Sequence, residues 1–298
     1  MRGKTILAVP AICFWSVIAV CVTGIVIGSF CDLEISKALA DVTPLGTYFA
    51  TYSPFFAYCL LPAGGVCLYT GLKKRGKPWK NVGILFAVFG WFMAVYFSNS
   101  YFSKNVRPMF GYDVSAGTAF LSSAASWLLW AALYAWVPFV VSRLLDNSDP
   151  VKLILVGAAL LMVCFMADVI MQWLKQVGSR PRYKYLISSK GSLDEFRNWY
   201  QMIPNLAGTD DSYMSWPSGH MSIVSVLFAL PVLTDCLKNR SSRKNVVAFC
   251  LVCVFVLLCG FNRIHMTNHF LSDVCFGVLI VSLITAGICT VCLKPVID

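Results

Sequence analysis

Long apolar runs decide the fold class of this chain. Runs of about 20 residues with few charges recur along it, and that length crosses the hydrocarbon layer of a bilayer as a helix. The whole chain is 58% hydrophobic, only 13% charged, and has a mean hydropathy of +0.71. Backbone in hydrocarbon must satisfy its own hydrogen bonds, and runs this long exclude strands. The sequence predicts an all-α, polytopic transmembrane helical bundle.

Eight spans are expected. The first run begins after Arg2 and Lys4, but its apolar stretch is too long for a signal peptide and no A-x-A site follows, so we interpret it as a retained span. No internal repeat or soluble domain is visible. The expected spans lie near residues 8–30, 50–72, 81–102, 118–142, 151–174, 219–236, 246–262 and 270–293.

Most of the 13 cysteines lie inside the apolar runs. The pairs Cys250/Cys253 and Cys289/Cys292 have C-x2-C spacing, but their surroundings are not hydrophilic enough for a metal. We interpret the cysteines as small apolar packing residues rather than as zinc ligands or a disulfide framework.

Basic residues orient the expected bundle. By the positive-inside rule, two strongly basic connections between spans are cytoplasmic. With an even number of spans, both termini are then cytoplasmic too, in agreement with Arg2, Lys4 and Lys294. The net charge of +10 is not arranged as a nucleic-acid-binding face, so we expect no nucleic-acid partner. The two connections contain Lys73, Lys74, Arg75, Lys77 and Lys80, and Lys238, Arg240, Arg243 and Lys244.

The outer side of the expected bundle consists of four connections, at 31–49, 103–117, 175–218 and 263–269. They contain acidic residues such as Asp32. The connection 175–218 is far longer than a helical hairpin needs, and long loops on rigid scaffolds commonly carry function.

Two cations flank the start of that long connection. They are Lys175 and Arg182, in the stretch Lys175-Gln-Val-Gly-Ser-Arg-Pro-Arg182-Tyr. A single Lys or Arg at a span end commonly extends to the lipid headgroups. Several cations on one outer face oppose the positive-inside bias, however. An anionic ligand explains them, because guanidinium groups match phosphate oxygens and lysine acts as a point charge.

The segment Pro217-Ser218-Gly219-His220 stands immediately before another apolar run. Such a position is a helix N-terminus, where free N–H groups and the helix dipole attract an anion. Gly219 permits close backbone approach. An ordinary N-cap accounts for the Pro, Ser and Gly but leaves His220 unexplained.

Arg263, His269 and Asp273 follow with the spacing R-x5-H-x3-D. His269 and Asp273 are expected on one face of the last helix, because they are four residues apart. A carboxylate that takes the Nδ1 proton of the imidazole leaves Nε2 free to attack. Polar pairing at the membrane interface is the alternative for these two residues alone. The basic connections lie elsewhere, and the topology that they indicate places all three polar segments on the outer side.

These three segments, in this order and at membrane boundaries, resemble the type 2 phosphatidic acid phosphatase superfamily. The resemblance covers about the last 150 residues and implies a six-helix core at 81–298, with catalytic segments at 175–183, 217–220 and 262–273. Residues 1–80 would then be an N-terminal transmembrane extension. Tyr183 stands where the family usually has Pro and Asn262 where it often has Ser, and neither position carries chemistry.

The resemblance also implies the role of each residue. His269 would be the nucleophile that forms a phosphohistidine, Asp273 its orienting group, and His220 the general acid and later base. The resemblance requires no metal or other cofactor. The groups that would bind the phosphoryl oxygens are Lys175, Arg182, Arg263, Ser218 and the amide of Gly219.

Three nearby residues have no assigned role. Arg180 either binds phosphate or a headgroup, or is a solvated loop cation. We interpret His265 as a helix-end histidine without chemistry. Asp168, inside the fifth span, is by default functional or paired, and we favour a structural partner for a buried cation.

We therefore expect an integral membrane phosphatase that acts on a lipid phosphomonoester or pyrophosphate. Phosphatidate, phosphatidylglycerol phosphate and polyprenyl pyrophosphate all remain open, and membrane lipids are its expected surroundings. A sugar-phosphate phosphatase resembling glucose-6-phosphatase is one alternative, and a transporter or flippase is another. No retention signal is visible at Lys294-Pro-Val-Ile-Asp298, which favours a bacterial plasma membrane with the active site facing outward. The sequence does not indicate an oligomeric state.

Overall fold

The computed structural model describes residues 5–105, 116–201, 203 and 211–297, with side chains left out at 101–105, 116–123 and 294–297. Arg2, Lys4 and Asp298, named above, lie outside the described residues, as does the side chain of Lys294. The expected connection at 103–117 is likewise described only at its edges.

The described chain is almost entirely helical, which confirms the predicted all-α bundle. A two-stranded hairpin, β1 (Thr5–Ile6) and β2 (Val9–Pro10), comes first. Short 3-10 turns follow at η2 (Leu193–Glu195), η3 (Asp211–Tyr213) and η4 (Val226–Ala229). The helices are α1 (Ala11–Leu39), α2 (Pro44–Tyr52), α3 (Pro54–Tyr58), α4 (Leu60–Lys73), α5 (Lys77–Asn105), α6 (Ala116–Leu144), α7 (Pro150–Gly178), α8 (Tyr183–Leu186), α9 (Gly219–Ser225), α10 (Leu230–Thr234), α11 (Ser242–His265) and α12 (Leu271–Ile297).

Seven helical segments among the described residues are long and apolar enough to cross a membrane. They correspond to seven of the eight expected spans. The remaining expected span, 219–236, forms the shorter run Gly219–Thr234, made of α9, η4 and α10. The sides of the long helices expose large apolar residues, such as Phe30 at 81% and Leu251 at 65%, as expected where helices face lipid.

The first span differs from the prediction. α1 continues to Leu39, whereas the first span was expected to end at residue 30 and to be followed by an outer connection. Asp32, expected in an outer loop, therefore lies on the helix and is only 1% exposed. The acidic residues after residue 30 looked typical of a loop, but one of them is buried by partners distant in the sequence.

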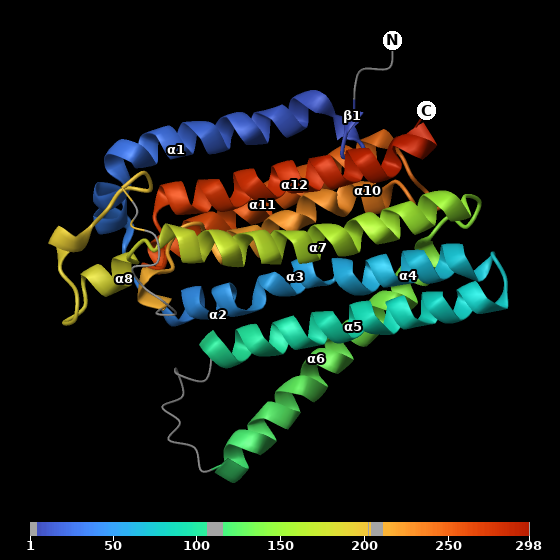
Figure 1. The fold of residues 1–298 in the computed structure, drawn as a ribbon, viewed down its shortest axis with the longest axis horizontal. Coiled ribbons are helices and arrows are strands. Elements are labelled where there is room, and N and C mark those ends of the chain that lie inside the picture. The colour runs from blue at the N-terminus through green and yellow to red at the C-terminus, as the bar shows by residue number, and fades with distance from the viewer. Residues whose placement is uncertain (1–4, 106–115, 202, 204–210, 298) are drawn as a thin grey trace.

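The first 80 residues pack into the same bundle as the rest. α1 lies against α12, and α4 lies against both α5 and α7 (Figure 1). α12 also contacts α7 and α9, so the last helix is at the centre of the packing. The division into an extension at 1–80 and a core at 81–298 stays a prediction.

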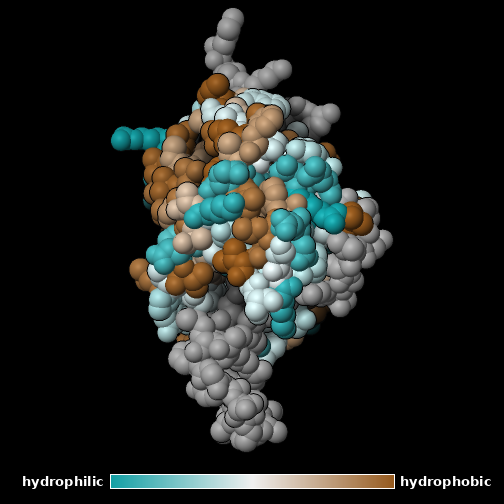
Figure 2. Space-filling view, turned by 90° about the vertical axis from the view of Figure 1, so that its left-hand side faces the viewer, coloured by the Kyte–Doolittle hydropathy of each residue, from teal (hydrophilic) through white to brown (hydrophobic). Residues whose placement is uncertain are grey.

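The two ends of the bundle are formed by different connections. Figure 1 shows β1, the α4–α5 connection and the far end of α12 on the right, and α8 with its loop on the left. The basic connection after α4 therefore lies opposite α8. Figure 2, which views the left-hand end, shows hydrophilic and hydrophobic side chains mixed on that surface.

Candidate active site

A cavity of about 650 Å³ opens near α8, between helices α5, α7 and α9 and the segment that joins α11 to α12. The structure brings six of the eight predicted site residues to its wall. The other two, Ser218 and Asp273, are fully buried behind it. The six that line the cavity are Lys175, Arg182, Gly219, His220, Arg263 and His269.

His269 is held by the backbone and not by Asp273. Its Nδ1–H donates to the carbonyl oxygen of Ser215 at 2.8 Å, which leaves the lone pair on Nε2. The expectation that Asp273 takes this proton was wrong, because α12 begins only at Leu271 and His269 precedes it. Asp273 instead accepts from the Ser215 hydroxyl at 2.5 Å and from the backbone N–H of Phe270 at 3.0 Å. Its action on His269 is indirect.

Burial and nearby cations keep His269 neutral. Desolvation is the largest cause that lowers its pKa well below 6.5, followed by the positive charges of Arg182, Arg263 and Lys175. The hydrogen bond to Ser215 acts in the opposite direction but does not cancel these effects. A neutral imidazole with a free Nε2 is the form that can attack phosphorus.

His220 lies in the first turn of α9 and is buried. Its Nε2 is 2.9 Å from the hydroxyl of Ser53, which stands between α2 and α3. Sequence reasoning missed Ser53, because a hydroxyl within an apolar run has no local feature that distinguishes it. The contact places a residue of the first 80 directly on a predicted catalytic side chain.

The Ser218–Gly219 segment begins α9, and the side chain of Lys175 lies close to it. Ser218 caps α9 by accepting from the N–H of Met221 at 3.4 Å, and its own N–H donates to the carbonyl of Asp273 at 3.0 Å. The N-cap interpretation is therefore correct, and the phosphate-binding role of Ser218 stays a prediction. A Cβ on Gly219 would come within 3.0 Å of Cε and Nζ of Lys175. Glycine at this position lets the lysine lie across the start of the helix.

The cationic wall also contains an acidic partner. Arg182, 6% exposed, donates from Nη2 to Oδ1 of Asp211 at 2.7 Å and from Nε to the Asp211 carbonyl at 2.8 Å. Lys184 lies 3.7 Å from the same carboxylate. Arg263, on the last turn of α11, is buried and lines the cavity. Three predicted phosphate-binding cations, with Lys175 as the third, thus share one wall.

The residues without an assigned role are also placed. Arg180 is fully buried and does not line the cavity, so both interpretations, phosphate ligand and solvated loop cation, were wrong. His265 donates from Nδ1 to the carbonyl of Leu39 at 2.8 Å, away from the cavity. Asp168 lines the cavity and accepts from Gln172 at 3.4 Å. Within the described part of the chain no cation pairs with Asp168, so our preferred interpretation of that residue was wrong.

Tyr183 and Asn262, where the sequence departs from the resembled family, have structural contacts. The ring of Tyr183 packs on Phe270 with centroids 6.1 Å apart. Asn262 donates from Nδ2 to the carbonyl of Gly46 at 3.0 Å, which ties α11 to α2. Neither residue lines the cavity.

The elements α4, α5, α7, α9 and η4 form a part of the cavity wall that combines apolar side chains with the polar residues Ser100, Asp168, Gln172 and Ser222. Among the described residues, no group of three or more His, Cys, Asp or Glu side chains is arranged to hold a metal ion. The apolar residues of this part include Leu61, Phe97, Met171, Ile223 and Val226.

Comparison with known proteins assigns the part of the chain that carries these residues. Residues 152–297 match the family model described as PAP2 superfamily. No curated protein and no solved structure matches the chain. The matched region includes α7, α9, α11 and α12, and hence all eight predicted site residues.

Proposed function

The chain belongs to the PAP2 superfamily through residues 152–297, and we propose that it is a membrane phosphatase specific for phosphorylated lipids. Members of this superfamily are phosphatases, and the long apolar helices are those of an integral membrane protein. The proposed substrate is a lipid phosphomonoester or pyrophosphate. Phosphatidate, phosphatidylglycerol phosphate and polyprenyl pyrophosphate all belong to this class.

The observation that supports a lipid is the composition of the cavity wall. It contains Lys175, Arg182 and Arg263 with the two histidines, and also apolar side chains from α4, α5, α7, α9 and η4. A molecule with a phosphate at one end and a hydrocarbon chain at the other is complementary to both sets of residues. A sugar phosphate would leave the apolar side chains in contact with water or with sugar hydroxyl groups.

The proposed reaction uses His269 as the nucleophile. Its Nε2 attacks phosphorus, and the bond from phosphorus to the leaving oxygen breaks while His220, which carries a proton once the anionic phosphate is bound, gives that proton to the leaving oxygen. His220 then takes a proton from water, the water oxygen attacks phosphorus, and the P–N bond breaks. The products are the dephosphorylated lipid, inorganic phosphate and neutral His269.

The cations and N–H groups stabilise charge that develops on the phosphoryl oxygens. Lys175, Arg182 and Arg263 would contribute most, because they lie in a partly water-excluded cavity where electrostatic interactions are stronger than in water. Gly219 contributes its N–H and Ser218 its hydroxyl. The mechanism needs no metal step.

The proposed location of the active site is the extracytoplasmic face of the membrane, with both termini cytoplasmic. The basic connection at 73–80 lies at the end of the bundle opposite α8 (Figure 1), and basic connections face the cytoplasm. A bacterial plasma membrane remains the proposed location.

A phosphate-release assay tests the proposal. The purified protein in detergent micelles is given the three lipid substrates and glucose 6-phosphate, with and without a chelator. We expect release from at least one lipid, little release from the sugar phosphate, and no release by His269→Ala. Preference for the sugar phosphate would overturn the lipid assignment. Transport of an intact lipid phosphate by His269→Ala would favour a transporter instead.

A further inference from the structure

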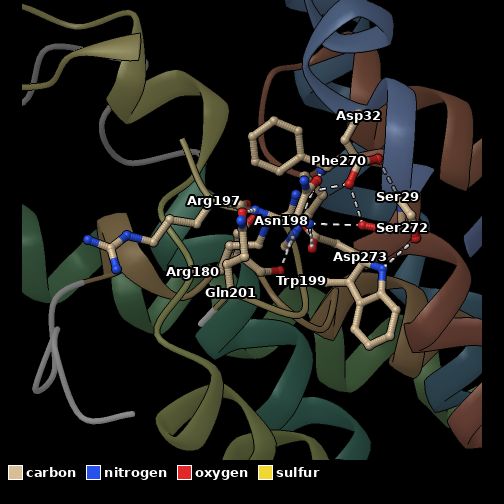
Figure 3. A network of polar contacts seen from close by, with 12 residues as sticks. Ser29, Asp32, Arg180, Arg197, Asn198, Trp199, Gln201, Phe270, Ser272 and Asp273 are labelled. Atoms are coloured by element: carbon tan, nitrogen blue, oxygen red, sulfur yellow. Dashed lines mark hydrogen bonds and ion pairs between the residues drawn. The ribbon is translucent and has the colours of Figure 1, made fainter. Parts of the chain in front are cut away.

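Arg180 is the most completely buried cation in the described part of the chain, with 0% exposure. Its guanidinium group bridges two buried carboxylates, as Figure 3 shows. Nη1 donates to Oδ1 of Asp273 at 2.6 Å, and Nη2 donates to Oδ2 of Asp32 at 2.9 Å. The third nitrogen, Nε, donates to the carbonyl of Arg197 at 2.8 Å. The side chain thus joins α1, the long loop and α12.

Ser272 completes this network. Its hydroxyl accepts from Nη1 of Arg180 at 2.9 Å and donates to Oδ2 of Asp32, and its N–H donates to Oδ1 of Asp32 at 3.0 Å. The ring of Phe270 lies 4.3 Å from the guanidinium carbon. Two carboxylates face one guanidinium group, so these extra donors stabilise charges that burial alone would disfavour.

Close packing of α1 on α12 brings Asp32 into this network. A Cβ on Gly28, one turn before Asp32, would come within 2.9 Å of the backbone nitrogen of Ser272. The helices therefore approach one another because residue 28 has no side chain. Trp199 adds a second contact between the long loop and α1, since its Nε1–H donates to the hydroxyl of Ser29 at 2.9 Å (Figure 3).

The network is one residue away from the proposed nucleophile. Asp273, which pairs with Arg180, accepts from the hydroxyl of Ser215, and the carbonyl of Ser215 accepts from His269. The carbonyl of Arg180 also accepts from the N–H of Ser215 at 3.0 Å. Arg180 thus holds Ser215 from two sides, through its own backbone and through Asp273.

We propose that Arg180 and Asp32 are positioning residues, which set the orientation of His269 through Asp273 and Ser215. The proposal rests on the proposed function, in which His269 is the nucleophile. Asp32 belongs to the first 80 residues, outside the region that matches the family. In this account α1 is a necessary part of the active site and not an accessory span.

The central test is Asp32→Asn, which keeps the size of the side chain and removes its charge. Misplacing a reacting group by about 1 Å can cost roughly 100-fold in rate, so we expect kcat to fall by about tenfold to 100-fold. KM should change little, because Lys175, Arg182 and Arg263 remain in place. The matched control is Glu34→Gln, the same chemical change on an exposed position of the same helix, which should leave kcat as in the wild type.

The variant Arg180→Lys gives a second, independent test. Lysine keeps the positive charge but cannot bridge two carboxylates with a planar group. We therefore expect kcat to fall and KM to stay unchanged. Wild-type kcat in Asp32→Asn and Arg180→Lys would overturn the proposal. An increase in KM at unchanged kcat would overturn it too, because it would assign Arg180 to substrate binding.

Each rate is normalised to folded protein, measured as the fraction that elutes as a single species in detergent. If Asp32→Asn does not fold, Ser272→Ala replaces it, since this variant keeps both ion pairs and loses only the bridging hydroxyl. We expect a smaller loss of kcat there, and wild-type kcat would overturn the proposal. Activity in His269→Ala would refute the proposed function itself, whereas an inactive His269→Ala with a fully active Asp32→Asn would refute only the positioning role.

Discussion

At the residue scale, a backbone carbonyl rather than an acidic side chain fixes the tautomer of the proposed nucleophile. The Ser215 carbonyl accepts from Nδ1 of His269, which selects one tautomer. Burial and three cations then lower the pKa of that imidazole. Both effects favour the neutral ring with a lone pair on Nε2, and each has a separate experimental consequence.

The pH dependence of kcat/KM tests the charge of His269. Because its pKa in the folded protein lies well below 6.5, the nucleophile stays neutral as the pH falls through 6.5, and the acidic limb should lie below that value. In the unfolded chain the same imidazole takes up a proton near 6.5, so its contribution to the free energy of unfolding decreases as the pH falls below 6.5. Lys175→Gln removes one cation and should move the acidic limb to higher pH. A limb at or above 6.5 in the wild type would contradict this account.

Ser53→Ala tests the partner of His220. The variant loses the hydroxyl that lies 2.9 Å from Nε2 of His220, and a hydrogen bond of this kind contributes about 0.5–1.5 kcal/mol. We expect kcat to fall by roughly twofold to tenfold, measured as phosphate release from lipid micelles. Thr51→Val is the control, because this nearby hydroxyl donates to the carbonyl of Thr47, within its own helix. An equal effect of both variants would mean that Ser53 has no specific role.

At the element scale, the start of α9 and the end of α7 form one unit. Lys175 lies in the last turn of α7, and its side chain crosses the start of α9 at Gly219. The helix after Ser218 begins there because the Ser218 hydroxyl caps it. The position of the cation therefore depends on the absence of a side chain on the neighbouring helix.

Gly219→Ala should displace Lys175 without disturbing the fold. The new Cβ would lie 3.0 Å from the lysine Cε and Nζ, and the flexible lysine side chain can move aside. A hydrogen bond to a charged group contributes about 1.5–3 kcal/mol, so we expect KM to rise roughly tenfold or more. Gly287→Ala is the matched control, since no atom lies within 4 Å of its new Cβ. An unchanged KM in Gly219→Ala would show that Lys175 does not bind the phosphoryl group.

The sequence predicted the helices and the residues that line the cavity better than it predicted the hydrogen-bond network behind them. The long apolar runs and the spacing of the polar segments are local patterns, and they located the helices and the residues that line the wall. The network of Asp32, Arg180 and Asp273 joins residues far apart in the chain, so no local pattern indicates it. Asp32 looked like a loop residue, and Arg180 looked solvated, because the residues that surround each of them are distant in the sequence.

At the scale of the whole molecule, the basic connection between α4 and α5 lies at one end of the bundle, and the cavity with α8 lies at the other. The first and last helices pack together along their length, so the N-terminal 80 residues and the region that matches the family form one packed body. The proposed extracytoplasmic position of the cavity rests on this arrangement and on the positive-inside rule.

Epitope tags test the orientation in intact cells. A tag inserted after Lys190, in the exposed loop that follows α8, should bind antibody from outside the cell. A tag inserted after Asn239, in the basic connection before α11, should bind only after the membrane is permeabilised. Each tagged protein must retain phosphate release for the result to count. The opposite pattern would place the active site in the cytoplasm.

Trapping of a phosphorylated enzyme tests the central claim most directly. The protein is mixed with a lipid carrying a ³²P-labelled phosphate and quenched in alkali, because phosphohistidine is labile in acid. The account predicts label on His269 in the wild type and none in His269→Ala, with both proteins equally folded. Label on another residue, or phosphate release by His269→Ala, would contradict it.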